Sequence, residues 1–423
     1  MLAARRGRYH RQIVASKTRP KTAHIPELDG LRGVAVLLVL FFHFSFVFTL
    51  VTGPLKGLRT LFTPGWTGVD LFFTLSGCLI TGILLDEKAT DGYFKRFYIR
   101  RALRIFPVYY LALLVCFTVA RPWLLPLEGV SPVALLAYLA NFSNWLSVNQ
   151  TEIPAMNHYW SLAVEEQFYF CWPLAVCFLD RKWLPRLVGG VIVLAPIVRF
   201  CILSSAGEAE ALRRIAYVLT PARADGLAFG ALVAMIVRNS TLCAAIVKRS
   251  AGAIAAVVFL LVAWFGLKAR FHLESAATLA VLYSVISLAF ALIVLRTVSR
   301  TGTNGLAQIA LRMPVLRGAG KYSYAAYVFH MPLMAATEPI FQNLSPQARQ
   351  LAALPWFLGS IAVTFALARL SWWLLERPIL RWKDVLAPSP QTAVELAPET
   401  PAMAVPSTGD VAALLRLAAR GGR

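Results

Sequence analysis

PELDGLRGVAVLLVLFFHF, residues 26–44, passes from a polar start into a nearly unbroken apolar run. Together with the residues that follow, the run is long enough to cross a bilayer core of about 30 Å as a helix, and we expect this span at 31–52. Two ionisable side chains, Arg32 and His43, lie inside it. Charged groups cost free energy within a membrane, so both residues need a partner or a function.

Arg32 and His43 are expected on nearly the same face of this helix, because eleven residues make close to three turns. At a rise of 1.5 Å per residue they would lie about 16 Å apart along the axis. We therefore predict one cavity, with Arg32 at its mouth and His43 in its depth. The alternative is a packing histidine bonded to a backbone carbonyl, and the arginine on the same face favours function.

Similar apolar runs recur through the 423-residue chain, which is 58% hydrophobic and 15% charged. Soluble proteins carry about 25% charged residues. We predict an all-α polytopic membrane protein, a bundle of about ten transmembrane helices with cytoplasmic N- and C-termini. The expected spans are 31–52, 65–85, 105–121, 160–179, 187–203, 215–237, 250–267, 275–296, 320–341 and 355–376.

The net charge of +21 lies mainly in segments between the apolar runs, as the positive-inside rule requires of cytoplasmic loops. A nucleic-acid-binding protein would gather this charge on a soluble domain, so that class is excluded. One further apolar stretch, 132–148, cannot cross without moving the later basic loops outside. We expect it to be interfacial or re-entrant.

Three regions are expected along the chain: a basic cytoplasmic tail at 1–24, a transmembrane domain at 25–383, and a disordered Pro/Ala-rich cytoplasmic tail at 384–423. The six cysteines show no CxxC spacing, so we expect neither a disulfide framework nor a metal site.

Arg101 and Arg104 lie three residues apart where the third span begins, so they share a helix face. Two guanidinium groups there could hold phosphates bidentately. The alternative is ordinary positive-inside charge, and the spacing alone leaves both interpretations open.

Other polar side chains fall within or beside the later spans. The adjacent Glu165 and Glu166 point in different directions on a helix, so we expect at most one to face a cavity. A direct role and a helix-packing polar network are both open for the pair Arg223 and Asp225 and for His330. The remaining candidates, expected near the outer side of the membrane, are Asp70, Tyr159 and Trp160.

Taken in order, several motifs resemble the membrane-bound acyltransferase-3 family of bacterial O-acyltransferases. They are PELDGLRGVAVLLVLFFHF, GVDLFFTLSGCLITGIL, RRALRIFPVYY, NHYWSLAVEEQFYFCWP, RADGLAFGALVA, KYSYAAYVFHMP and the closing ERP at 376–378. They cover residues 25 to about 380. The resemblance implies ten helices, an acyl-CoA donor, a carbohydrate hydroxyl as acceptor, and functional importance for Arg32, His43, Arg101, Arg104 and the Glu165 region. Some members carry a fused extracytoplasmic esterase-like domain, and we expect this chain to act through its membrane domain alone.

The expected activity is the transfer of an acyl group, acetyl in the first instance, from cytoplasmic acyl-CoA to a carbohydrate-containing acceptor at the bacterial inner membrane. Arg32, Arg101 and Arg104 would hold the phosphates, and His43 would act as general base or as a transient acyl carrier. The residues expected around the acceptor are Asp70 and Glu165 in catalysis, with Glu166, Tyr159, Trp160, Arg223, Asp225 and His330 in support.

The rival class is a transporter or flippase of a glycan or glycolipid, in which intramembrane charges line a substrate path. No internal repeat pairs the two halves of the chain, which disfavours it. The acyl group, the glycan, the choice between base and acyl carrier, and the oligomeric state stay open.

Overall fold

The computed structural model of the chain describes residues 25–388, apart from 89, 121–129, 272–274 and 301–302. The predicted N-terminal tail and most of the predicted C-terminal tail lie outside the described residues. Every regular element of the described part is a helix, which confirms the all-α prediction.

Each predicted span corresponds to a long helix in the described chain. These helices are α2 (Pro26–Phe44), α4 (Gly68–Glu87), α5 (Tyr93–Phe117), α8 (Tyr159–Phe178), α9 (Leu184–Leu203), α11 (Thr220–Val237), α12 (Ser240–Phe271), α13 (Ala276–Ser299), α16 (Ser323–Gln342) and α17 (Pro346–Ser371). Shorter helices connect or extend them: α3 (Pro54–Phe62), α7 (Pro132–Leu139), α10 (Ala209–Val218), α14 (Leu306–Arg312), α15 (Pro314–Lys321), α18 (Arg377–Leu380) and α19 (Lys383–Leu386).

Seven helical segments among the described residues are long and apolar enough to cross a membrane. Six of them contain α2, α4, α9, α11, α13 and α17, and the seventh, Ser240–Leu260, is the first part of α12. The predicted spans at α5, α8 and α16 are helical but are not among these seven. The chain is therefore a multi-pass membrane protein, while the number of crossings and the side of each terminus stay predictions.

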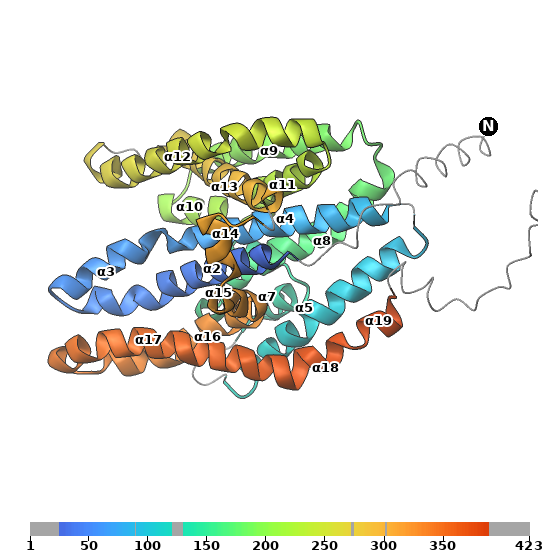
Figure 1. The fold of residues 1–423 in the computed structure, drawn as a ribbon. Coiled ribbons are helices and arrows are strands. Elements are labelled where there is room, and N and C mark those ends of the chain that lie inside the picture. The colour runs from blue at the N-terminus through green and yellow to red at the C-terminus, as the bar shows by residue number, and fades with distance from the viewer. Residues whose placement is uncertain (1–24, 89, 121–129, 272–274, 301–302, 389–423) are drawn as a thin grey trace, which may run out of the picture.

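The helices form three layers in Figure 1, with α9, α11, α12 and α13 on one side, α2, α4 and α8 in the middle, and α16 and α17 on the other side. Helix α5 runs obliquely beside α8 and the end of α17. The polar side chains discussed below lie mainly on α2, α4, α5, α8 and α16.

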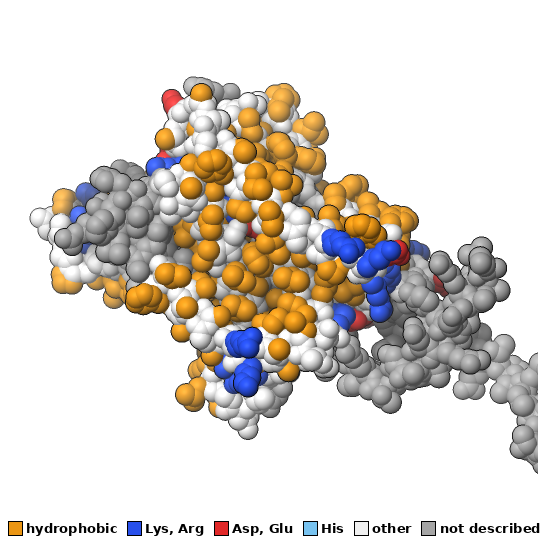
Figure 2. All heavy atoms as spheres, turned by 90° about the horizontal axis from the view of Figure 1, so that it is seen from above, with side chains coloured by type: hydrophobic (Ala, Val, Ile, Leu, Met, Phe, Trp, Pro, Cys, Tyr) orange, Lys and Arg blue, Asp and Glu red, His pale blue; other side chains and the backbone are white. Residues whose placement is uncertain are grey.

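Hydrophobic side chains cover much of the face that Figure 2 shows, and Lys and Arg gather in small groups near its ends. Soluble monomers rarely expose large apolar patches, whereas lipid-facing surfaces require them. Exposed apolar residues on the outer layer include Val193, Leu194, Ile197 and Phe200 of α9 and Val258, Phe259 and Leu260 of α12.

The segment 132–148 does not form a spanning helix. The eight residues of α7 rise only about 12 Å, and a 3-10 turn at Ser143–Val148 follows a left-handed residue, Asn141. The buried Asn144 side chain donates to Thr220 Oγ1 at 2.9 Å and accepts from Gln167 Nε2 at 3.0 Å. These bonds satisfy polar groups that would be costly in lipid, and the interfacial or re-entrant placement stays a prediction.

Helices α4 and α11 approach each other through glycines. A Cβ atom on Gly77 would lie 2.0 Å from the Leu227 carbonyl oxygen, and one on Gly230 would lie 2.1 Å from that of Thr74. Small residues permit such backbone contact between membrane helices, where van der Waals packing drives association. The GVDLFFTLSG and RADGLAFG motifs thus contain the residues that bring these two helices together.

Glycines also set the contacts of α2 with α14, at Gly30, and with α15, at Gly33. A Cβ atom on Gly30 or Gly33 would lie 2.1 Å from the carbonyl oxygen of Leu311 or Leu316, respectively. Glu27, at the start of α2, accepts from Arg312 Nε at 2.8 Å. The DGLRG motif therefore fixes the start of α2 and, with it, the position of Arg32.

We predict that Gly230→Ala lowers the thermal unfolding midpoint of the purified protein in detergent. The added methyl group must force α4 and α11 apart, and overpacking of this kind costs about 1–3 kcal/mol. Gly189→Ala on α9 is the matched control, because a Cβ atom there meets nothing within 4 Å. Equal midpoints for the two variants would contradict the close contact of α4 with α11.

Candidate active site

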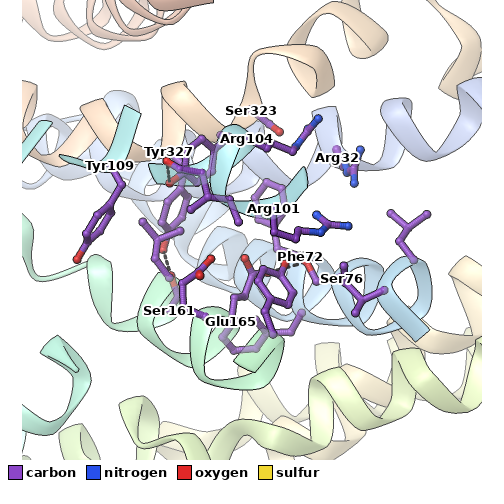
Figure 3. A pocket seen from close by; sticks show the side chains of 18 of the residues that line it. Arg32, Phe72, Ser76, Arg101, Arg104, Tyr109, Ser161, Glu165, Ser323 and Tyr327 are labelled. Carbon is purple, nitrogen blue, oxygen red and sulfur yellow. Dashed lines mark hydrogen bonds between the residues drawn. The ribbon is translucent and has the colours of Figure 1, made fainter. Parts of the chain in front are cut away.

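A cavity lies among α2, α4, α5, α8 and α16. Its volume is about 870 Å³, including space that is open to solvent. We call it the arginine cavity, because Arg32 of α2 and Arg101 and Arg104 of α5 line it. Figure 3 shows the three guanidinium groups gathered on one side, with Tyr109, Ser161 and Tyr327 toward the other. The sequence prediction that these arginines share one cavity agrees with this arrangement.

Two carboxyl groups face the three arginines. Glu165 and Glu166 of α8 both line the arginine cavity, which corrects the expectation that at most one of them would face a cavity. Glu165 accepts from Ser76 Oγ at 2.7 Å, and the Arg101 guanidinium lies 5.3 Å from the centroid of the Tyr169 ring. The cavity is wide enough for neighbouring side chains on α8 to reach it, and its arginines outnumber its carboxyl groups.

A second cavity of about 820 Å³ contains His43. We call it the histidine cavity, because His43 and His158 line it. Aromatic rings form most of the remaining wall, with Asn157 and Arg214 beside them: the aromatic residues are Phe42, Trp66, Trp160, Tyr217, Tyr283 and Tyr327. Such a mixture of aromatic faces and few polar groups is typical of a pocket for a ligand with both apolar and polar surfaces.

Three imidazole rings cluster at this cavity. The ring centroid of the buried His330 lies 4.9 Å from that of His43 and 4.7 Å from that of His158. Each ring has one nitrogen within hydrogen-bond distance of a backbone carbonyl: His43 Nδ1 at 3.0 Å from Val39, His330 Nδ1 at 2.6 Å from Tyr327, and His158 Nε2 at 3.3 Å from Val328. A carbonyl only accepts, so each of these nitrogens carries its hydrogen. When a ring is neutral, its other nitrogen therefore has a lone pair that can accept a proton. In His43 this nitrogen is Nε2.

The two cavities meet at Val69 of α4 and Tyr327 of α16, which line both of them. The sequence predicts a single cavity running from Arg32 to His43, and the structure differs from this expectation. Arg32 lines the arginine cavity and His43 the histidine cavity, although both belong to α2. Val69 and Tyr327 come from helices far apart in the chain and mark the place where the two cavities adjoin.

Asp70 is not among the residues that line either cavity. It is fully buried and accepts from Arg223 Nη2 at 2.6 Å. The Arg223 guanidinium in turn lies 4.5 Å from the centroid of the Tyr283 ring and 5.1 Å from that of Tyr217. The pair thus anchors the start of α4 and supports two aromatic walls of the histidine cavity from behind, so the geometry favours a structural role for both.

A second buried pair joins Asp225 to Arg199, with 2.8 Å between Oδ2 and Nη2. Asp225 also accepts from Ser284 Oγ at 2.6 Å, and Arg199 donates to the Ala280 carbonyl at 2.7 Å. Arg199 is not among the predicted site residues, although an arginine inside an apolar run itself indicates a buried partner or a function. This network ties α9, α11 and α13 together behind the histidine cavity, because the Arg199 guanidinium lies 5.6 Å from the centroid of the Tyr283 ring that lines it.

The two aromatic residues predicted at the start of α8 have different surroundings. Trp160 lines the histidine cavity, and its ring centroid lies 4.8 Å from that of Tyr217. Tyr159 is fully buried behind the lining of this cavity, with its ring centroid 5.3 Å from that of Tyr109.

Five residues that line the histidine cavity were not predicted from the sequence: His158, Trp66, Tyr217, Tyr283 and Arg214. Among them, only His158 could have been found, because it directly precedes the predicted pair Tyr159 and Trp160.

The charge of Arg214 is balanced at the edge of the histidine cavity. Its Nε donates to Glu152 Oε1 at 3.1 Å, and Ser147 Oγ donates to the same oxygen at 2.5 Å. Burial raises the pKa of Glu152, but these hydrogen bonds outweigh burial and hold the pKa below its usual value. The carboxylate therefore stays ionised beside Arg214, and this rim is close to neutral.

Among the described residues, no group of three or more His, Cys, Asp or Glu side chains is arranged to hold a metal ion. Independently of this, the guanidinium groups of the arginine cavity can bind anions, and the imidazole of His43 in the histidine cavity can transfer a proton.

Residues 25–373 match the family described as "Acyltransferase domain". The peptidoglycan O-acetyltransferase OatA of Listeria monocytogenes is 30% identical over 383 residues, covering 86% of this chain and 57% of that protein. The O-acetyltransferase OatA of Staphylococcus aureus is 26% identical over 379 residues, covering 84% and 57%. No solved structure matches the chain.

This chain thus spans little more than half the length of those relatives. The family match, in contrast, extends over most of the described helices, including every residue that lines the two cavities. The chain belongs to the acyltransferase-3 family.

Proposed function

We propose that this protein is a membrane-bound O-acyltransferase that moves an acetyl group from acetyl-CoA in the arginine cavity to a carbohydrate hydroxyl in the histidine cavity. The observation that carries the proposal is that His43, with a free Nε2 lone pair, lines a cavity of aromatic rings that adjoins a cavity of arginines. The printed names of the relatives support acetyl as the group and a glycan as the acceptor class.

The arginine cavity suits the phosphate groups of coenzyme A. Three guanidinium groups converge there, and arginine binds phosphate oxygens through paired, charge-assisted hydrogen bonds. Glu165 and Glu166 in the lining, and Asp29 at 3.8 Å from Arg32, would keep the arginines oriented toward the phosphates. We therefore assign Glu165 a supporting role beside the donor rather than contact with the acceptor.

The proton transfer is assigned to His43. The bond from Nδ1–H to the Val39 carbonyl fixes the tautomer, so Nε2 can take the proton of an acceptor hydroxyl as general base. The hydroxyl oxygen then bonds to the thioester carbonyl carbon, the carbon–sulfur bond breaks, and the proton passes from His43 to the coenzyme A thiolate. Attack by Nε2 itself, giving an acyl-histidine, uses the same lone pair and stays an alternative route.

The acceptor is assigned to the aromatic part of the histidine cavity. Trp66, Trp160, Tyr217 and Tyr283 offer ring faces of the kind that pack against sugars, and Asn157 and Arg214 offer polar contacts. Since Glu152 balances the charge of Arg214, we expect an uncharged sugar unit of a polysaccharide or glycolipid to bind. The bacterial inner membrane is the proposed location.

Replacing Arg101 with Gln is predicted to raise the KM for acetyl-CoA by about 10- to 100-fold. Hydrogen bonds to charged groups contribute about 1.5–3 kcal/mol, and every 1.4 kcal/mol is a factor of ten. Initial rates of the purified protein with varied acetyl-CoA measure the change. Arg186→Gln, at an exposed arginine outside both cavities, is the control. An unchanged KM in Arg101→Gln would remove the arginine cavity as the donor site.

His43→Gln should lower acetyl transfer by about 10²- to 10⁴-fold, because glutamine cannot take up the proton. Transfer is followed with isotope-labelled acetyl-CoA and candidate glycans, with mass spectrometry of the product. Calorimetric binding of acetyl-CoA should stay within about threefold of wild type, since the arginines are intact. A variant that folds and retains full transfer would refute both the base and the acyl-carrier route, and transport of unmodified glycan would favour the rival class.

A further inference from the structure

Val69 and Tyr327 are the two residues common to the linings of the arginine and histidine cavities. Both side chains are almost fully buried, at 5% and 6% exposure. Any acyl group that travels from coenzyme A in one cavity to His43 in the other must pass between or beside them. We call this pair the dividing wall.

Tyr327 is held firmly in the wall. Its hydroxyl group lies 2.6 Å from Ser161 Oγ and 3.2 Å from the His158 carbonyl oxygen, both of which belong to the start of α8. Its ring centroid lies 6.1 Å from that of Phe72 and 5.4 Å from that of His158. Figure 3 shows the tyrosine hydroxyl pointing toward Ser161 from the neighbouring helix.

Val69 is held from two sides. It lies in the first turn of α4, next to Gly68, where a Cβ atom would lie 2.5 Å from the Ala35 carbonyl oxygen of α2. Asp70, on its other side, is fixed by the ion pair with Arg223. A branched side chain on such a constrained turn has few conformations with which to yield space.

We propose that Val69 and Tyr327 select the acyl group by length, admitting acetyl and hindering longer chains. This inference rests on the acyl transfer proposed above and names the residues that set its donor specificity. The physical argument is steric: each methylene beyond acetyl must enter the gap between a fixed β-branched side chain and a hydrogen-bonded ring, and close-packed interiors resist even one added methylene. Longer chains would therefore bind in the arginine cavity yet deliver the thioester carbon to His43 poorly.

The test compares the kcat/KM of purified protein for acetyl-, propionyl- and butyryl-CoA with one glycan acceptor. Val69→Ala should raise the butyryl-to-acetyl ratio by about tenfold or more, since one methylene in a tight pocket discriminates by about 10- to 200-fold. Val69→Ile should lower the ratio. Tyr327→Phe keeps the ring but removes both hydroxyl contacts, so the ratio should rise by a smaller factor.

Two control variants shorten side chains that line one cavity only. Leu79→Ala widens the arginine cavity, and Met331→Ala widens the histidine cavity. Neither should change the butyryl-to-acetyl ratio, even if it alters the rate, because neither lies in the dividing wall. A structural loss of activity would lower all three donors together and leave the ratio unmoved.

The inference is overturned if wild type transfers butyryl as fast as acetyl, or if the controls relax chain-length selection as much as Val69→Ala. It is also overturned if Val69→Ala and Val69→Ile both fold, transfer acetyl and keep the wild-type ratio. Absence of transfer from every donor in wild type is a different result, which refutes the proposed function itself.

Discussion

A charge enclosed by apolar helices is unstable unless an opposite charge or a polar partner lies in contact with it. This constraint divides the arginines of the bundle into two groups. Arg199 and Arg223 are fully buried and each contacts an aspartate, and these pairs connect α4, α9, α11 and α13. The three arginines of the arginine cavity share its lining with two carboxyl groups, and Asp29 lies 3.8 Å from Arg32; because they converge on one open space, they are suited to bind an anion supplied from outside.

Most of the fold follows from features that the sequence states locally. Apolar runs of about 20 residues give the long helices, because only regular backbone satisfies its own hydrogen bonds in lipid. Charge in the following loops was enough to predict that 132–148 does not span. The contacts between helices could not be predicted in this way. Gly77 and Gly230 bring α4 and α11 together, but the residues around each glycine do not indicate which helix it contacts.

The site could be predicted where spacing along one helix places polar residues on the same face. Arg101 and Arg104 share a face by spacing, and the arginine cavity gathers them with Arg32 as predicted. The division into two cavities was not predictable, because Val69 and Tyr327 are 258 residues apart and no periodicity relates them. The same reason explains why the ion pair between Asp70 and Arg223 was not predicted, because only tertiary packing brings α4 and α11 together.

The dividing wall has a consequence for the cell that is separate from catalysis. On the predicted topology, the arginine cavity opens toward the cytoplasm and the histidine cavity toward the outside. Water would then enter one cavity from each side of the bilayer. Val69 and Tyr327, the residues common to both linings, would then form the boundary that limits leakage of protons and small solutes. If the proposed acyl transfer occurs there, side chains held by packing and hydrogen bonds would preserve the ion gradient of the membrane better than an open pore.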